Sequence, residues 1–417
     1  MGTPPRVRQR RAVANDERIL DVAVELLATE GWLNFLPSRV GAEAGLSRQS
    51  VLRRFPARGA LATAIWHHRL SPDLSHILAE LLSAAGLLAD ESGSGSAPSA
   101  TSGTPEALVS ALQPLLNVAV PMRSAAELLV IAHFEPALHE AITGTLGAQV
   151  TAWCTPGRRG PSPVLAAQRA YLLEQGLGLL IAGRRPGIAD FDALSAATQL
   201  MQALNSPTEP VNLPRTPAKH LDERTVPFDT GDPIRDLLLQ AALDGVSEHG
   251  FDGVSVQSIA DAAGYSEGTL WNRWPSKLTL FEEATERQLT LGLKVNHDWL
   301  QNITSQYGQG VAEAVHAREV QRPTRRHLRA LNLEQARLAW HHPELSEGIE
   351  LQLAQFVSGY QVAHPEWTVA EATTHLHFEW AFGFGAVVLP LLHREAWRLP
   401  YDVITTPMSR SASEPSA

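Results

Sequence analysis

Several features that would assign this chain to a familiar class are scarce or missing. The 417 residues include one cysteine, Cys154, which excludes an internal disulfide framework and fits a reducing compartment. The N-terminal stretch is basic but lacks the apolar core and cleavage site of a signal peptide. The longest apolar run, Trp380–Leu392, is too short to span a bilayer and is typical of a buried helix. We therefore expect a cytoplasmic protein without membrane contact.

Positive charge and strand patterns are also in short supply. The net charge of −10 argues against attraction of the whole surface to nucleic acid, so any such contact must come from local basic patches. Strand signals are nearly absent, whereas apolar residues recur with helical spacing throughout. The length exceeds that of one ordinary core. The sequence therefore predicts an all-α protein of several domains.

An internal repeat dominates the chain. Residues 19–61 and 238–280 align without a gap at an offset of 219, and nine positions are identical. These include Gly31/Gly250, Gly45/Gly264, Ser47/Ser266, Arg54/Arg273, Pro56/Pro275 and Leu61/Leu280. Such a repeat indicates the architecture before any single motif does.

The segments that follow repeat as well, at an offset of 207. Glu127, Ala132, Pro136, Leu138 and Ile142 correspond to Glu334, Ala339, Pro343, Leu345 and Ile349, and Gly176-x-Gly178 corresponds to Gly383-x-Gly385. Two blocks with one offset indicate that a whole subunit is duplicated. The expected domains are residues 12–62, 63–204, 233–281 and 282–405, with a proline-rich linker at 205–232.

The repeated unit has the features of a helix-turn-helix. In the second copy, Gly264 can take the positive φ of a sharp turn, and Ser266 is placed to cap the next helix. Leu270 points inward, Trp274 closes the core, and Ser276 caps the following helix. Two short helices at a tight turn are typical of DNA-binding modules.

The ends of the first helix of each copy are also marked. Asp16 is the expected N-cap in the first copy, and Gly31 is the expected stop. In the second copy Asp232 caps a helix that begins at Pro233.

A matched pair of cations, Arg58 and Lys277, starts the fourth helix of each copy. The helix dipole disfavours a cation in a first turn. We therefore expect an anion nearby, such as a DNA phosphate.

On these motifs the chain resembles the TetR family of transcriptional regulators. The second copy reads SIADAAGYSEGTLWNRWPSKLTL, close to the helix-turn-helix pattern of that family, and the first copy (RVGAEAGLSRQSVLRRFPARGAL) is a weaker match. The resemblance implies two tandem TetR-like subunits, each a three-helix DNA-binding domain followed by a helical ligand-binding and dimerisation domain. The third helix of each unit would enter the major groove, and later helices would form a bundle and enclose an effector pocket.

The resemblance also implies DNA-binding residues. Base-reading candidates are Arg48, Gln49, Ser50, Leu52 and Arg53 in the first copy, with Glu267, Thr269, Trp271 and Asn272 in the second. Phosphate candidates are Arg54, Arg58, Arg273 and Lys277. The chain departs from the family in carrying two motifs, in replacing the second aromatic with Arg54 or Arg273, in placing Pro37 at a helix start and in lacking a cap at Ala57.

The two copies differ in charge. Residues 1–70 carry eleven arginines against six acids, whereas residues 219–290 carry six basic residues against thirteen acids. DNA affinity rests largely on phosphate neutralisation. The first copy therefore has the stronger electrostatics, and the second has the clearer motif.

Other signals are weaker. Gly176-x-Gly178 and Gly383-x-Gly385 lie within helices and follow no strand, so we expect close helix packing and no nucleotide cofactor. The pairs His67-His68 and His341-His342 lack ligands at suitable spacing, so no metal site is expected. Aromatic residues in helices are more often core than pocket, but candidates for an effector pocket are Glu127, His133, Glu334, Trp340, His341, Phe378, Trp380 and Phe382.

The sequence therefore predicts a ligand-responsive repressor that binds double-stranded DNA as an intramolecular pseudo-dimer, with further self-association left open. Two alternatives remain. The acidic second copy could dock a protein partner in place of DNA, or the chain could be a helical enzyme, for which no nucleophile–base pair is visible.

Overall fold

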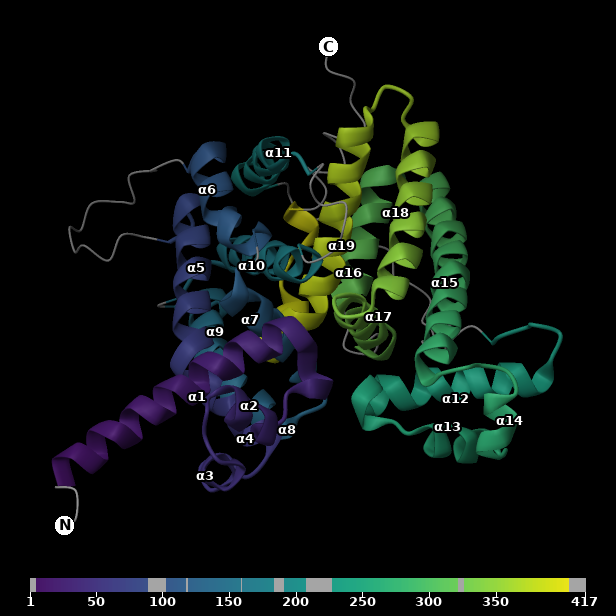
Figure 1. Cartoon of the computed structure of the whole chain (residues 1–417). Coiled ribbons are helices and arrows are strands. Elements are labelled where there is room, and N and C mark those ends of the chain that lie inside the picture. Colours follow the sequence, from purple (N-terminus) through teal and green to yellow (C-terminus); the bar gives the residue numbers. More distant parts are fainter. Residues whose placement is uncertain are drawn as a thin grey trace, which may run out of the picture.

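The computed structural model describes residues 5–88, 103–117, 119–158, 160–183, 191–207, 227–321 and 326–404 (Figure 1). These residues form helices, with no strand among them, as expected for an all-α protein. The first half contains α1 (Pro5–Asn34), α2 (Pro37–Glu43), α3 (Arg48–Leu52), α4 (Arg58–Ile65), α5 (Ser71–Ala84), α6 (Pro105–Leu116), α7 (Val120–Ile131), α8 (Pro136–Ile142), α9 (Ala148–Cys154), α10 (Pro163–Ala182) and α11 (Ala193–Asn205). Two π-helical segments, Trp66–Leu70 and Thr143–Gly147, join α4 to α5 and α8 to α9.

The second half follows the same order with fewer breaks. It contains α12 (Pro233–His249), α13 (Val256–Ala263), α14 (Glu267–Trp271), α15 (Lys277–Tyr307), α16 (Gln309–Gln321), α17 (Arg326–Ala339), α18 (Pro343–Ala363) and α19 (Val369–Leu392), with short 3₁₀ turns at Phe251–Gly253 and Ala396–Arg398. Most of the proline-rich linker predicted at 205–232 lies outside the described residues.

Side-chain caps explain where the helices of the second copy begin. The Asp232 carboxylate accepts from the Ile234 N–H at 3.0 Å, with Pro233 at the first helical position, and Ser266 and Ser276 cap α14 and α15. Gly264 ends α13 at a φ of 79°, a left-handed conformation that favours glycine. These predicted caps and this turn are confirmed.

The expected start of the first helix is wrong. Asp16 lies inside α1, which begins at Pro5, and its carboxylate pairs with Arg54. The preceding arginines and alanines are good helix formers, and proline suits the first helical position, so the helix extends upstream of the only acid that looked like a cap. Pro37 likewise starts α2.

Helix α19 is long and strongly apolar. Within the described ranges it is the one helix long and apolar enough to cross a membrane, but 67% of its most apolar window is buried inside the protein. The run Trp380–Leu392 lies within it and packs against the first half. Burial by other helices accounts for its composition.

Helices α10 and α19 pack on each other through two glycines. A Cβ atom on Gly178 would overlap the backbone of Ala381, and a Cβ atom on Gly385 would overlap the backbone of Glu174. Ala381 and Glu174 are themselves related by the offset of 207, so the contact is reciprocal. The predicted packing of these helices is present, made by the second glycine of each Gly-x-Gly pair.

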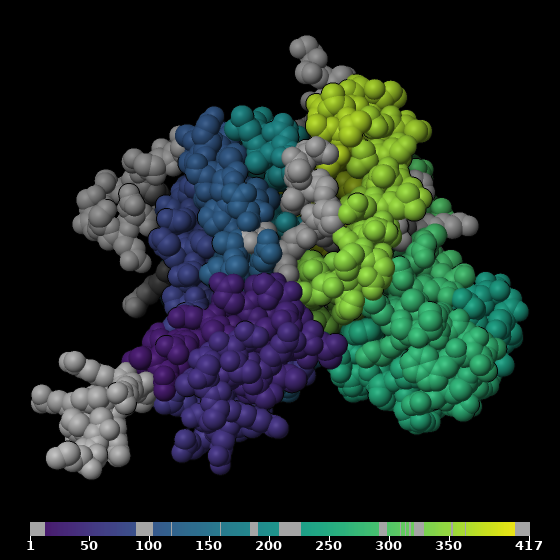
Figure 2. Space-filling model, viewed as in Figure 1, coloured from purple at the N-terminus to yellow at the C-terminus, as the bar shows by residue number. Residues whose placement is uncertain are grey.

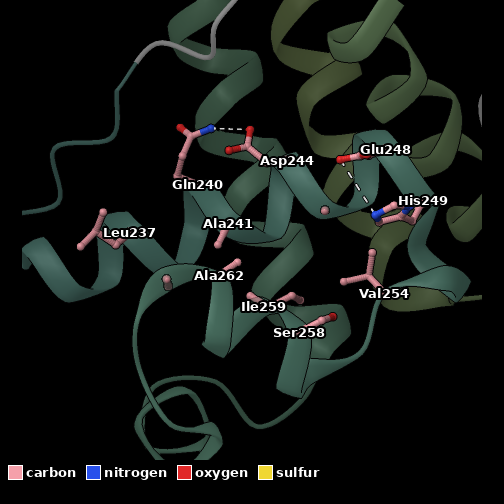
Figure 3. A pocket seen from close by; sticks show the side chains of 12 residues that line it. Leu237, Gln240, Ala241, Asp244, Glu248, His249, Val254, Ser258, Ile259 and Ala262 are labelled. Carbon is pink, nitrogen blue, oxygen red and sulfur yellow. Dashed lines mark hydrogen bonds and ion pairs between the residues drawn. The ribbon is translucent and has the colours of Figure 1, made fainter.

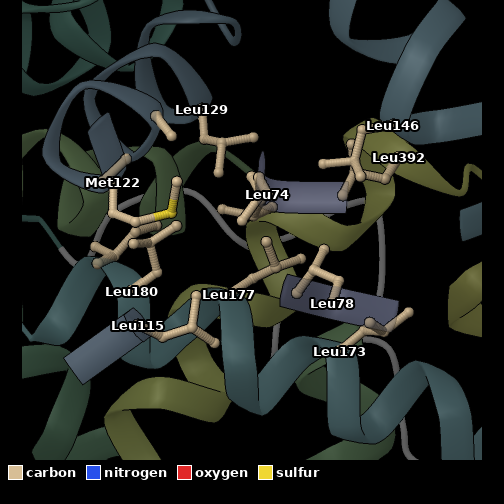
Figure 4. Close-up of a cluster of buried hydrophobic side chains, with 14 of the residues drawn as sticks. Leu74, Leu78, Leu115, Met122, Leu129, Leu146, Leu173, Leu177, Leu180 and Leu392 are labelled. Carbon is tan, nitrogen blue, oxygen red and sulfur yellow. The ribbon is translucent and has the colours of Figure 1, made fainter. Parts of the chain in front are cut away.

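One of the hydrophobic cores contains residues of both halves. The C-terminal part of α19 and residues up to Ile404 belong to the core of the first half, and Leu392 lies among the first-half residues Leu74, Leu78 and Leu146 (Figure 4). The end of α19 is also held by hydrogen bonds: Thr151 donates to the Leu392 carbonyl at 3.1 Å. The C-terminal part of the chain is therefore built into the N-terminal half.

A second core joins α12–α15 to α17–α19. Both three-helix units, α1–α3 and α12–α14, lie at the same end of the molecule (Figures 1 and 2). Helices α10 and α19 lie above both units in the view of Figure 1.

The reciprocal glycine contact gives a matched pair of variants. Gly178→Ala should lower the free energy of unfolding by about 1–3 kcal/mol because the new methyl group has no space against the α19 backbone. Gly383→Ala should be neutral or stabilising by up to about 1 kcal/mol, since nothing lies within 4 Å and alanine is the better helix former. Urea unfolding of both variants measures the difference, and equal midpoints would contradict the packing described.

Candidate nucleic-acid interface and domain junction

In the first copy, α3 presents the predicted base-reading residues outward. The side chain of Ser47 caps this helix by accepting from the Ser50 N–H at 3.2 Å, and Val51 is buried beneath it. Arg48, Gln49 and Arg53 are exposed, whereas Ser50 and Leu52 are half-buried. Arg54 is exposed but forms an ion pair with Asp16. Three long polar side chains are therefore available on the surface of α3.

In the second copy, α14 carries a different set. Trp271 is 45% exposed and Asn272 is exposed, whereas Glu267 and Thr269 are half-buried. The Thr269 hydroxyl lies 3.1 Å from that of the capping Ser266. Trp271 and Asn272 are thus the most accessible candidates here.

Arg273 braces the second unit internally. Its guanidinium contacts the Asp232 carboxylate at 3.1 Å and donates to the Thr269 carbonyl at 3.1 Å. This contact holds the pKa of Asp232 below its ordinary value. The start of α12 is thereby tied to the end of α14.

The cations at the start of α4 and α15 make internal contacts. Arg58 donates to the Trp32 carbonyl at 3.0 Å and lies over the indole ring at 4.4 Å. Lys277 donates to the Phe251 and Val254 carbonyls at 2.7 and 2.8 Å. Burial lowers the pKa of both cations. The geometry gives both side chains a structural role, and their contact with phosphate stays a prediction.

Each three-helix unit also touches the opposite half. Gly31 has a φ of 72°, and a Cβ atom there would collide with the His341 ring. Gly250 has the same φ, and a Cβ atom there would collide with the Phe134 ring. Phe134 and His341 correspond at the offset of 207, so this contact is reciprocal too.

A buried ionic cluster occupies this junction. Arg337 on α17 contacts Glu127 of the first half at 3.1 Å, Glu334 at 2.7 Å and Asp252 of the second three-helix unit at 3.0 Å. Glu127 also lies 3.1 Å from the Nε2 atom of His341 and accepts from the backbone N–H of Trp32 at 2.9 Å. One guanidinium therefore connects three parts of the chain.

The cluster is fully desolvated at its centre. The Arg337 side chain is 2% exposed, and those of Glu127 and Glu334 are 0% exposed. The surrounding carboxylates raise the pKa of Arg337 above its ordinary value, whereas burial raises that of Glu334.

Of the residues in this cluster, Glu127, Glu334 and His341 are among those predicted from the sequence, whereas Arg337 and Asp252 are not. A signal was present, because Arg337 stands at the position of the apolar Val130 of the first half, one helical turn after Glu334. A charged residue at a core position requires a buried partner.

Three of the aromatic candidates for an effector pocket, Phe378, Trp380 and Phe382, pack against other aromatic residues. Phe378 packs near Phe191 with ring centroids 5.9 Å apart, and Phe382 packs near Tyr171 at 5.4 Å. Trp380 contacts Phe356 at 6.3 Å, whereas Trp340 packs on the first core and His133 lies half-buried at the end of α7. Of the eight candidates for an effector pocket, the structure therefore brings Glu127, Glu334 and His341 together, at the ionic cluster.

Among the described residues, a groove and a smaller cavity lie at the three-helix units. A groove of about 350 Å³ between α12 and α13 is lined by Leu237, Ala241, Asp244, Glu248 and other residues (Figure 3). A smaller cavity of about 110 Å³ lies at the junction, between residues of both units and both halves.

Comparison with known families supports the helix-turn-helix assignment. Residues 238–284 match the model for bacterial regulatory proteins of the tetR family. No curated protein matches the chain. This stretch is therefore similar to the DNA-binding domain of this family, which supports a DNA-binding transcriptional regulator.

The ionic cluster predicts a large difference between two arginine variants. Arg337→Met should lower the free energy of unfolding by about 3–5 kcal/mol because three buried carboxylates lose their shared partner. Arg398→Ala, which removes an exposed pair with Glu395, should change it by less than about 0.5 kcal/mol. Denaturant unfolding tests both, and a small effect of Arg337→Met would contradict the dependence of the three carboxylates on one guanidinium.

Proposed function

We propose that this chain is a ligand-responsive transcriptional repressor that binds an asymmetric DNA operator as an intramolecular pseudo-dimer. Each half would act as one subunit, with residues 12–62 and 233–281 as the DNA-binding domains and 63–204 and 282–405 as the effector-binding and dimerisation domains. The protein would act in the cytoplasm. The family match favours a regulator over the helical enzyme considered from the sequence.

The reciprocal contact between α10 and α19 carries the proposal. Gly178 meets the backbone of Ala381 and Gly385 meets that of Glu174, so equivalent surfaces face each other. Self-complementary contact of this kind is the mark of a two-fold dimer interface. Here both partners belong to one chain.

The DNA-binding surface supports a two-site mode of binding. Helices α3 and α14 lie at the same end of the molecule (Figure 1). A two-fold dimer of helix-turn-helix units contacts two half-sites about one helical turn apart. The two half-sites would differ because Arg53 corresponds to Asn272 and Leu52 to Trp271.

Regulation would follow from the spacing of the two units. DNA would favour one spacing, and an effector would favour another, which shifts the population between them. The cluster around Arg337 supports this coupling because it joins Asp252 of one DNA-binding domain to Glu127 of the other half.

Selection of bound sequences from a random DNA pool tests the proposal. The full chain should enrich an asymmetric site, with one half-site richer in guanine contacts, because arginine pairs with guanine and asparagine with adenine. Recovery of a perfect palindrome would contradict intramolecular pairing of the two copies.

Variants assign each half-site to its helix. Arg53→Ala should relax the preference at one half-site by about 1–3 kcal/mol, and Asn272→Ala should do so only at the other. Arg398→Ala is the control, because this residue is exposed in the 3₁₀ turn that follows α19. It should leave both preferences unchanged. If both variants lost preference at the same half-site, the assignment of one helix to each half-site would be wrong.

An alternative keeps DNA binding in the first copy alone. The groove between α12 and α13 has the 50% exposed Leu237 in its lining and the acids Asp244 and Glu248 at its edge, features that suit a protein partner. Under this alternative Asn272→Ala leaves the selected DNA sequence unchanged.

A further inference from the structure

We propose that the junction cavity of about 110 Å³ is a binding site for a small organic cation, such as a protonated amine. The site lies between the two DNA-binding domains, apart from the aromatic residues of the helical lobes. Its role as an effector site rests on the function proposed above, whereas binding itself does not.

The cavity combines aromatic and acidic walls. Trp32 and Phe134 contribute rings, and Glu135, Asp252 and Glu334 contribute carboxylates. Arg58 also lines the cavity, and its guanidinium lies 4.4 Å from the centre of the Trp32 ring. Aromatic faces and carboxylates both attract cations, and a partly desolvated site strengthens that attraction. His249 at the rim is exposed, so the cavity is reached from the surface.

An unsatisfied oxygen atom of Glu334 is independent evidence for a ligand in this cavity. Its side chain is 0% exposed and lines the cavity, and its Oε2 atom accepts from Arg337 at 2.7 Å. The Oε1 atom has no hydrogen-bond partner within the described part of the chain. A buried carboxylate oxygen without a donor is costly, so a ligand N–H in the cavity would satisfy it.

The local charges leave room for one more cation. Four carboxylates meet here, those of Glu127, Glu135, Asp252 and Glu334, against the three cations Arg58, Lys277 and Arg337. Each cation already has partners: Arg58 and Lys277 bind backbone carbonyls, and Arg337 is shared among three carboxylates. None of these contacts reaches the Oε1 atom of Glu334, which is therefore the atom that an added cation would bind.

The size of the cavity limits the ligand. A 150 Å³ cavity accommodates benzene, so about 110 Å³ fits roughly four non-hydrogen atoms, with any longer tail directed past His249. The described residues offer no group of three His, Cys, Asp or Glu side chains arranged for a metal ion. An alkylammonium head fits both the volume and the lining.

Binding would act on the ionic cluster. An ammonium group on Glu334 and Asp252 would compete with Arg337 for the same carboxylates, which loosens the tie between the second DNA-binding domain and the first half. The two domains could then change their spacing, and DNA affinity would fall in step with occupancy of the cavity.

The experiment is a titration of the full chain with n-propylammonium chloride at constant ionic strength, followed by ligand-observed NMR. Saturable binding to one site is expected, whereas the neutral 1-propanol should bind at least tenfold more weakly because it lacks the charge. Absence of saturation, or equal binding of the alcohol, would overturn the proposal.

Two variants and a control locate the site. Glu334→Gln should weaken binding at least tenfold, and Gly253→Val, at an exposed lining position with a φ open to any residue, should block the cavity while leaving every charge in place. Glu140→Gln, on the exposed face of α8, should leave binding unchanged. If Glu334→Gln does not fold, binding of n-propylammonium to Gly253→Val tests the site. Unchanged affinity of that variant would show that the cation binds elsewhere.

The titration contains no DNA, so its result is separate from that of the site selection. A chain that selects DNA but takes up no n-propylammonium loses the cation site alone. A chain that takes up the cation but selects no DNA keeps the site and loses the proposed function.

Discussion

Contact between α10 and α19 depends on two positions without a side chain. At Gly178 and Gly385 the backbones approach so closely that even a methyl group has no room. This approach brings the C-terminal part of α19 into the core of the first half, where Leu392 packs and Thr151 binds its carbonyl. The positions of both three-helix units follow, because each is fixed to helices that are themselves fixed to α10 or α19.

A second constraint operates where those units meet the opposite halves. Gly31 fits against His341 and Gly250 against Phe134, so the two units are braced in the same way. The ionic cluster breaks this symmetry, because Arg337 corresponds to Val130 in the other half. Burying one guanidinium among three carboxylates adds little net stability over an apolar core. Under the proposed function it would make the junction responsive to a charged ligand. An apolar junction would offer no such response.

Much of this fold could be predicted from the sequence. Helical spacing and caps such as Asp232, Ser266 and Ser276 are local features, and the repeats at offsets of 219 and 207 indicated two equivalent halves. Asp16 was misread because a cap and a distant ion-pair partner look alike in sequence. Arg337 and Asp252 were missed because their pairing joins residues 85 positions apart, which no local pattern encodes. The junction cavity depends on the same long-range packing.

The number of chains on the shortest selected DNA site is the most direct test of a single-chain pseudo-dimer. Light scattering or native mass spectrometry of the complex gives that number from its mass. Intramolecular pairing of the two copies predicts one 45.2 kDa chain per site, with both half-sites occupied. An obligatory complex of two chains on the shortest site, each contributing one helix-turn-helix, would contradict it.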